Sequence, residues 1–137
     1  IAPADAPSHI WGYAVGLDMT RRDLQFALRD KGRPWDVAKG FDFSAPISPL
    51  KPIALTGELT SAAIWLEVNG QKRQSSDIAK LIWNVNETIG HLSKYFTLVP
   101  GDLIYTGTPE GVGAVSPGDA LVGGIAGLGT LQVKVVE

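Results

Sequence analysis

The sequence predicts a β-rich domain of mixed α/β class with a few short helices, on the strength of three observations. The chain has 137 residues, which is enough for one domain with a hydrophobic core. It contains 16 glycines and 9 prolines, a density of turn formers more typical of β-rich folds than of helical bundles. Residues 10–17 and 130–136 alternate with the two-residue period of strands. We therefore expect short strands joined by tight turns.

Charge and composition argue against several classes of partner. Twelve Lys and Arg against fourteen Asp and Glu give a net charge of −2, with no basic stripe, so nucleic acid is not an expected partner. The absence of cysteine excludes a disulfide framework and a thiolate metal site. It also fits a reducing compartment, and we expect a cytoplasmic location. No apolar run approaches the roughly 18 residues that span a bilayer, so no membrane partner is expected.

The chain opens on a segment rich in proline and alanine. Residues 1–9 have the composition of a connector, and residue 1 is not Met. We expect residues 10–137 to form a single domain that is incomplete at its N-terminal side, with an N-terminal portion preceding the connector.

The first element is a strand. In residues 10–17 large side chains alternate with Gly and Ala, which predicts one crowded and one bare face. Asp18 continues the bare face at the end of the strand.

A helix is predicted next. Thr20 and Asp23 have the spacing of a variant capping box, and Gly32 is a stop signal. The expected apolar stripe is Leu24, Ala27 and Leu28, with Arg22, Gln25 and Arg29 on the opposite face. Residues 33–52 carry four prolines and predict an irregular loop.

A hairpin and a second helix follow. Asn69-Gly70 lies between two extended runs within 62–74 and predicts a β-hairpin. Residues 86–96 suit a helix, with Asn84 as N-cap and Glu87 as N3 residue.

The last third is predicted to be β. Two Pro-Gly-Asp turns, at 100–102 and 117–119, each precede an apolar run, at 103–105 and 120–122. Gly127 to Gly129 predicts a tight turn into a final strand.

Asp18 is the first candidate functional residue. A carboxylate at the end of a bare-faced strand could bind Mg²⁺ or Mn²⁺ through its oxygens. It could also cap the helix that begins near Thr20, and local sequence alone favours that interpretation.

Three further residues could bind negative charge. Arg22 and Gln25 lie one helical turn apart near Asp18 and could hold a carboxylate or a developing oxyanion, although a solvated helix face is the simpler interpretation. Lys39 lies among aromatic residues, where partial desolvation would suit it to stabilise an anion; most such lysines reach water.

The glycine-rich stretch 105–113 is the most informative part of the sequence. Its glycines, Gly107 among them, let the backbone come close to a ligand. The Thr108 hydroxyl and free N–H groups could then cradle an anion or a carbonyl. By itself such a stretch is also an ordinary tight turn.

Taken together, several runs of residues resemble the fumarylacetoacetate hydrolase family. The runs follow the family's order and cover nearly the whole chain: 12–25, 32–35, 39–42, 68–70 with Arg73 and Gln74, 100–104 and 106–113. The last run, Thr-Gly-Thr-Pro-Glu-Gly-Val-Gly, is highly specific. Residues 77–83 and the short turn after Gln74 are similar to the fumarylpyruvate hydrolase branch of the family.

The resemblance implies a fold, a reaction and a site. The fold is a rolled mixed β-sheet, usually in a homodimer, and residues 10–137 would be the catalytic domain. The reaction is metal-dependent hydrolysis of the carbon–carbon bond of acylpyruvates, which are small diketo acids of aromatic catabolism. Mg²⁺ or Mn²⁺, or alternatively Ca²⁺, would bind at Asp18. Oxyanion and substrate contacts would come from Arg22, Gln25 and Lys39, with Thr108 and Gly107 holding substrate.

The sequence departs from the family pattern in one respect. The family pairs this aspartate with two glutamates in a Glu-x-Glu motif and uses a His–Glu pair as general base. This chain has no Glu-x-Glu motif and no glutamate before Glu58. We expect those groups to lie outside the sequence, and residues 1–137 alone to be inactive.

Two alternatives to acylpyruvate hydrolysis remain open. An oxaloacetate decarboxylase or an isomerase/decarboxylase on the same scaffold would use the same residues. A non-catalytic binding module that kept the fold is the other alternative, and the missing glutamates favour it.

Overall fold

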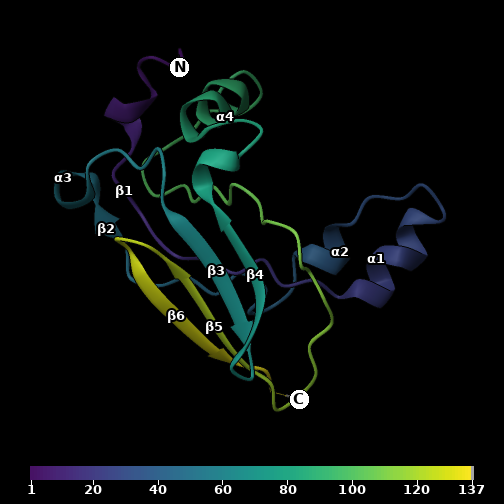
Figure 1. Cartoon of the computed structure of the whole chain (residues 1–137). Helices are drawn as coiled ribbons and strands as arrows, with labels where there is room; N and C mark the ends of the chain where they lie inside the picture. Colours follow the sequence, from purple (N-terminus) through teal and green to yellow (C-terminus); the bar gives the residue numbers. More distant parts are fainter. Residues whose placement is uncertain (137) are drawn as a thin grey trace.

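A four-stranded antiparallel sheet forms the centre of the protein in the computed structural model, which describes residues 1–136 (Figure 1). The strand order is β4-β3-β5-β6, and a two-stranded antiparallel sheet pairs β1 with β2. The bounds are β1 Gly12–Tyr13, β2 Lys51–Pro52, β3 Ala63–Val68, β4 Gln71–Asp77, β5 Ala120–Ile125 and β6 Gly129–Lys134. The predicted mixed α/β class with short helices is confirmed.

The helices are short and lie around this sheet. They are η1 Ala6–His9, α1 Arg22–Arg29, α2 Asp36–Lys39, α3 Ile53–Thr56, η2 Ile78–Lys80 and α4 Val85–Leu92. In Figure 1, α1 and α2 lie together on one side, and η1 lies near α4 at another. Within residues 1–136, no helix has both the length and the apolar character required to cross a membrane.

The predicted hairpin and Pro-Gly turns are confirmed. Asn69 and Gly70 both have positive φ, 52° and 74°, as a two-residue type I′ turn between β3 and β4 requires. Gly101 and Gly118 have φ of 101° and 95°, the left-handed conformation that a type II turn needs at its third position. The Asn69 amide also donates to Asp119 Oδ1 at 2.8 Å, which ties the hairpin turn to the second Pro-Gly turn.

The predicted strand at 10–17 is shorter than expected. Only β1 pairs regularly, and Gly16 adds an isolated bridge to Ile47. The facing segment 44–53 explains the interruption, because its three prolines have no N–H to donate to a ladder. The segment is nevertheless held along its length; for example, the Leu17 amide donates to the Pro46 carbonyl at 2.9 Å.

The expectations for the first helix are partly wrong. Its N-cap residue is Arg21 and makes no side-chain cap hydrogen bond, so the Thr20–Asp23 capping box is absent. The predicted apolar stripe faces outward at Leu24, which is 37% exposed, whereas Gln25 on the supposed polar face is 7% exposed. A helical period shows which residues share a face, but tertiary contacts decide which face is buried.

The end of α1 and the start of α4 follow the sequence prediction. The amide of Gly32 donates to the Arg29 carbonyl and that of Arg33 to the Leu28 carbonyl, which is the hydrogen-bond pattern of a Schellman stop. At α4, Asn84 and Glu87 form the predicted capping box, each side chain accepting from the other residue's amide.

Two other element predictions are wrong in extent. The helix predicted at 86–96 ends at Leu92, and Phe96 is 64% exposed rather than part of its apolar side. Within the described residues, 103–105 form no strand, and Tyr105 instead packs its ring against Gly16. The long loop 33–52 is irregular as predicted, except for α2 and β2.

The Asp119 carboxylate should make stability depend on acid pH. Hydrogen bonds from the Asn69 side chain, first, and from the Ser116 amide lower the pKa of Asp119 below its ordinary 3.8. A carboxyl with a lowered folded-state pKa stabilises the fold above its unfolded-state pKa, and this contribution is lost as pH falls through the folded value. We expect the free energy of unfolding to fall between about pH 5 and about pH 3, and to fall less steeply in Asp119→Asn. Urea denaturation of the full-length protein across this range measures both slopes; equal slopes would contradict the assignment.

Candidate active site

The carboxylate of Asp18 is held at the end of an extended segment. The amides on either side of it are fixed, since Leu17 donates to Pro46 O at 2.9 Å and Met19 to Ser44 O at 2.8 Å. Its side chain is 52% exposed, and Oδ2 lies 2.9 Å from the Lys39 Nζ. Asp18 does not cap α1, so the simpler of its two interpretations is wrong.

Lys39 ends α2 and reaches back to this aspartate. The helix is docked through Ala38, which is fully buried and whose carbonyl accepts from the Arg21 amide at 3.0 Å. The Lys39 side chain is 35% exposed. An ammonium in this position is partly desolvated and directed at one carboxylate, whereas most surface lysines extend into water.

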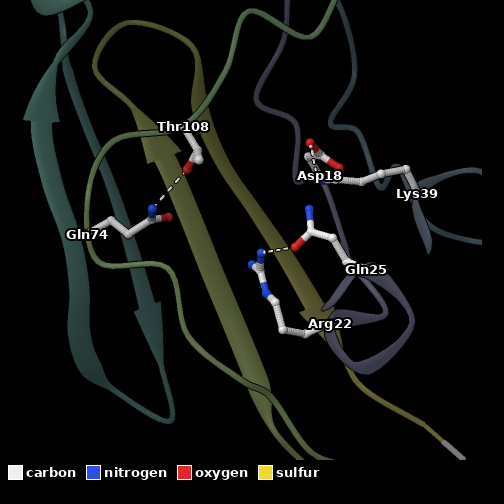
Figure 2. A network of polar contacts seen from close by, with 6 residues as sticks. All are labelled: Asp18, Arg22, Gln25, Lys39, Gln74 and Thr108. Carbon is white, nitrogen blue, oxygen red and sulfur yellow. Dashed lines mark hydrogen bonds and ion pairs between the residues drawn. The ribbon is translucent and has the colours of Figure 1, made fainter. Parts of the chain in front are cut away.

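Arg22 and Gln25 form a second polar pair on α1. Arg22 Nη1 donates to Gln25 Oε1 at 2.6 Å, across one turn of the helix. This bond fixes the amide, so that its nitrogen points away from Arg22 toward the side of Asp18 and Lys39 (Figure 2). Because Gln25 is buried, the interpretation of this face as solvated is wrong for Gln25. Its amide hydrogens are available to an anionic ligand.

The glycine-rich stretch 105–113 folds as a loop over β4. Thr108 Oγ1 accepts from Gln74 Nε2 at 2.8 Å, and the Pro109 carbonyl accepts from the same nitrogen at 2.7 Å. Gly107 has φ of 104°, which L side chains rarely adopt. At Gly111, with φ of 98°, a Cβ atom would overlap the Arg73 carbonyl, so the loop approaches the strand more closely than alanine permits.

Tyr105 joins this loop to the segment that carries Asp18. Its ring covers Gly16, where a Cβ atom would lie 2.6 Å from a ring carbon, and its hydroxyl donates to Ala45 O at 2.9 Å. Burial, and secondarily the negative charge of Asp18, raise the pKa of the Tyr105 phenol. Tyr105, at the start of the loop, therefore lies close enough to Asp18 for the two groups to interact electrostatically.

The central sheet also packs against the segment that carries Asp18. A Cβ on Gly123 of β5 would lie 3.3 Å from Leu17 Cδ2 and 3.7 Å from Leu66 Cδ1. Leu66 pairs directly with both Gly123 and Gln74, so these three positions share one face of the sheet. The residue before Asp18 and the residue that holds Thr108 consequently pack on the same face.

The residues present fit part of a divalent-cation site. Asp18 offers hard carboxylate oxygens, which Mg²⁺ and Mn²⁺ accept. Among residues 1–136, no three His, Cys, Asp or Glu side chains gather into a metal-binding group. Asp18 thus suits a single coordination position, and water, substrate or parts of the protein outside this chain would supply the others.

Two contributors to this site were missed by sequence reasoning. Tyr105 ends the apolar run 103–105 and begins the stretch 105–113, but the sequence indicates no role for its own side chain, and Gln74 is named only within a family motif. Every residue of β4 is polar, so no apolar alternation indicated that Gln74, at 8% exposure, is buried. A predicted hairpin arm made only of polar residues is unusual, and this was the one sign that a polar side chain of the arm is buried.

Comparison with known proteins identifies related sequences along the whole chain. The fumarylacetoacetate (FAA) hydrolase C-terminal family matches residues 1–136. Fumarylpyruvate hydrolase of a Ralstonia species is 55% identical over 126 residues, which is 92% of this chain and 65% of the relative. The mitochondrial oxaloacetate tautomerase of Arabidopsis thaliana is 44% identical over 130 residues, covering 95% of this chain and 58% of the relative.

Solved structures show the same fold. The crystal structure of fumarylpyruvate hydrolase from Pseudomonas aeruginosa in complex with Mn²⁺ and pyruvate matches with a TM-score of 0.97 and 58% identity. The match covers 99% of this chain and 58% of that one. The chain therefore spans about three fifths of the length of the relatives that it matches.

Proposed function

The chain belongs to the fumarylacetoacetate hydrolase family, and we propose that the whole protein hydrolyses acylpyruvates, with fumarylpyruvate as the favoured substrate. The products would be fumarate and pyruvate. The observation that carries this proposal is the meeting of Asp18 and Lys39, which are far apart in sequence, in a 2.9 Å ion pair. Beside them α1 presents the Arg22–Gln25 pair (Figure 2). The 55% identity to a fumarylpyruvate hydrolase supports the choice of substrate.

Asp18 would supply one oxygen ligand to Mg²⁺ or Mn²⁺, with Ca²⁺ as an alternative. The structure of the Pseudomonas aeruginosa relative with Mn²⁺ supports this part of the proposal. When bound, such an ion acts as a Lewis acid that polarises a carbonyl of the diketo acid.

The other residues would act on charge that develops during the reaction. Water adds to the acyl carbonyl, the bond to the neighbouring carbon breaks, and the pyruvate fragment leaves as an enolate that is then protonated. The attacked carbonyl oxygen becomes anionic, and Arg22, Lys39 and the free amide hydrogens of Gln25 are donors suited to that charge. Thr108 and the backbone at Gly107 would hold the keto acid end of the substrate.

An absorbance assay of the full-length protein with Mn²⁺ tests the reaction. Acylpyruvates lose their ultraviolet band when the bond between the carbonyls is cut, so fumarylpyruvate should lose this band in the presence of enzyme. No loss of the band at high enzyme concentration, with the metal bound, would overturn the proposal.

A second candidate is tautomerisation or decarboxylation of oxaloacetate. The 44% identity to an oxaloacetate tautomerase favours it, because this chemistry also passes through the enolate of a keto acid. Faster conversion of oxaloacetate than of fumarylpyruvate in the same preparation would replace the first candidate with the second. Failure to turn over either compound, with no heat of Mn²⁺ binding by calorimetry, would leave a non-catalytic binding module.

The proposal also covers the oligomeric state, the metabolic role and the location of the protein. We infer a homodimer acting in aromatic catabolism in the cytoplasm. Several large apolar side chains are strongly exposed in the isolated chain, among them Phe43 at 96%, Leu55 at 81% and Ile82 at 97%, which fits burial in a larger assembly. Light scattering of the full-length protein at several concentrations measures the oligomeric state.

A further inference from the structure

We propose that Gln74 is a positioning residue that makes Thr108 a hydrogen-bond donor to the keto acid. This inference rests on the proposed function, in which Thr108 holds substrate. Gln74 lies on β4, is 8% exposed, and its amide meets the loop that carries Thr108 (Figure 2).

The two hydrogen bonds of the Gln74 amide define its orientation. The Pro109 carbonyl, 2.7 Å away, can only accept, so the nitrogen of the amide must face it. The same nitrogen carries a second hydrogen, which it donates to Thr108 Oγ1 at 2.8 Å. Both hydrogens of the Gln74 amide are therefore committed to the loop.

This arrangement determines whether the Thr108 hydroxyl can donate a hydrogen bond to a ligand. A threonine hydroxyl has one hydrogen to donate and lone pairs that accept. Because a lone pair of Oγ1 already accepts from Gln74, the hydroxyl hydrogen must point elsewhere. It is thus available to an oxygen of the bound keto acid, which is an acceptor, and a donor aimed at an anionic oxygen forms the stronger class of hydrogen bond.

An irregularity in the sheet brings Gln74 and the loop together. Leu66 pairs with Gln74 but Glu67 pairs with Lys72, so Arg73 is an extra residue without a direct partner on β3. Such a bulge bends the strand and redirects the neighbouring groups. A Cβ atom on Gly111 would overlap the Arg73 carbonyl oxygen, so the loop contacts β4 through the Gln74 side chain and the Arg73 backbone.

Substitution of Gln74 by Met tests the role of the amide, since Met keeps the length of the side chain and loses both donors. In the full-length, Mn²⁺-loaded protein we expect Gln74→Met to raise KM for fumarylpyruvate about tenfold, with kcat changed by less than about threefold. The dissociation constant of pyruvate, measured by calorimetry, should rise by a similar factor. Gln71→Met is the matched control, because Gln71 lies on the same strand, is exposed, and should leave both quantities unchanged.

A double-mutant cycle separates positioning from a general structural effect. If Gln74 acts through Thr108, then Gln74→Met combined with Thr108→Val should bind pyruvate no more weakly than Thr108→Val alone. If Gln74 merely supports the fold, the two effects should multiply, which would overturn the inference.

A second variant covers the case in which Gln74→Met does not fold. Gln74→Glu replaces both amide donors with a carboxylate, which would accept the Thr108 hydrogen and face the Pro109 carbonyl without a hydrogen to offer it. Pyruvate binding should then weaken by more than about tenfold, because the hydroxyl hydrogen is drawn away from the keto acid. Unchanged pyruvate binding in Gln74→Glu would overturn the inference.

The failure of this inference differs from failure of the proposed function. A wild-type protein that hydrolyses fumarylpyruvate, with Gln74→Met unchanged in KM and pyruvate affinity, refutes only the role of Gln74. A wild-type protein that binds pyruvate without hydrolysing fumarylpyruvate refutes the proposed reaction, and the pyruvate affinities of the variants then decide the role of Gln74. A wild-type protein that does neither refutes both.

Discussion

Asp18→Ala is expected to abolish metal-dependent hydrolysis by the full-length protein, a loss of about a thousandfold or more. The reason is that Asp18 is the proposed protein ligand in this chain, and Lewis-acid stabilisation contributes several kcal/mol to such reactions. Calorimetry should show the affinity for Mn²⁺ falling with it. The fold should survive, because the Asp18 side chain is 52% exposed and exposed ion pairs contribute at most about 1 kcal/mol.

A second exposed carboxylate serves as the control for this substitution. Asp42 is exposed in the loop after α2 and forms no ion pair within residues 1–136. Asp42→Ala should retain activity and Mn²⁺ affinity. Full hydrolysis by Asp18→Ala in the presence of Mn²⁺ would refute the metal-ligand assignment, whatever its effect on stability.

Lys39→Ala is expected to lower kcat by about a hundredfold to a thousandfold, which corresponds to the roughly 2.7–4 kcal/mol lost with one oxyanion donor. The substitution should not weaken Mn²⁺ binding, because it removes a positive charge that lies 2.9 Å from Asp18 Oδ2. Metal affinity therefore distinguishes the two residues of the ion pair. Asp18→Ala loses affinity, whereas Lys39→Ala keeps or increases it.

The ion pair itself is too exposed to account for such a loss through stability. Its side chains are 35% and 52% exposed, so breaking it should change the free energy of unfolding by less than about 1 kcal/mol. Lys31→Ala, in the exposed turn after α1, is the matched control and should leave kcat unchanged. If kcat of Lys39→Ala equals that of the wild type, Lys39 does not stabilise the oxyanion.

The parts of the fold that could be predicted from the sequence depend on local interactions. The capping box of Asn84 and Glu87 and the Asn69-Gly70 turn each require only residues close in the chain, and both are present. The inward face of α1 depends on distant contacts, and there the prediction failed at Leu24 and Gln25. The strand predicted at 10–17 is short because the facing segment 44–53 contains prolines. The alternation within 10–17 gives no information about which segment faces it.

The candidate site shows the same division. Local spacing could not decide whether Asp18 is a helix cap or a metal ligand. It also could not distinguish Lys39 from an ordinary surface lysine. Family resemblance singled them out, and the structure adds that they form an ion pair. The family resemblance includes Gln74 but indicates no role for it, because the burial of a glutamine in an all-polar strand becomes evident only with the loop that it holds in place.

The packing of Leu17 against Gly123 has a consequence for the order in which parts of the proposed site form during synthesis and folding. Strand β5 is synthesised late, yet the segment that ends in Asp18 rests on it. A nascent chain emerging from the ribosome therefore carries Asp18 long before the strand against which its segment packs has been made. Contacts between such distant parts of a chain form slowly. The proposed site should therefore form late in folding, and partly synthesised chains are expected to lack activity.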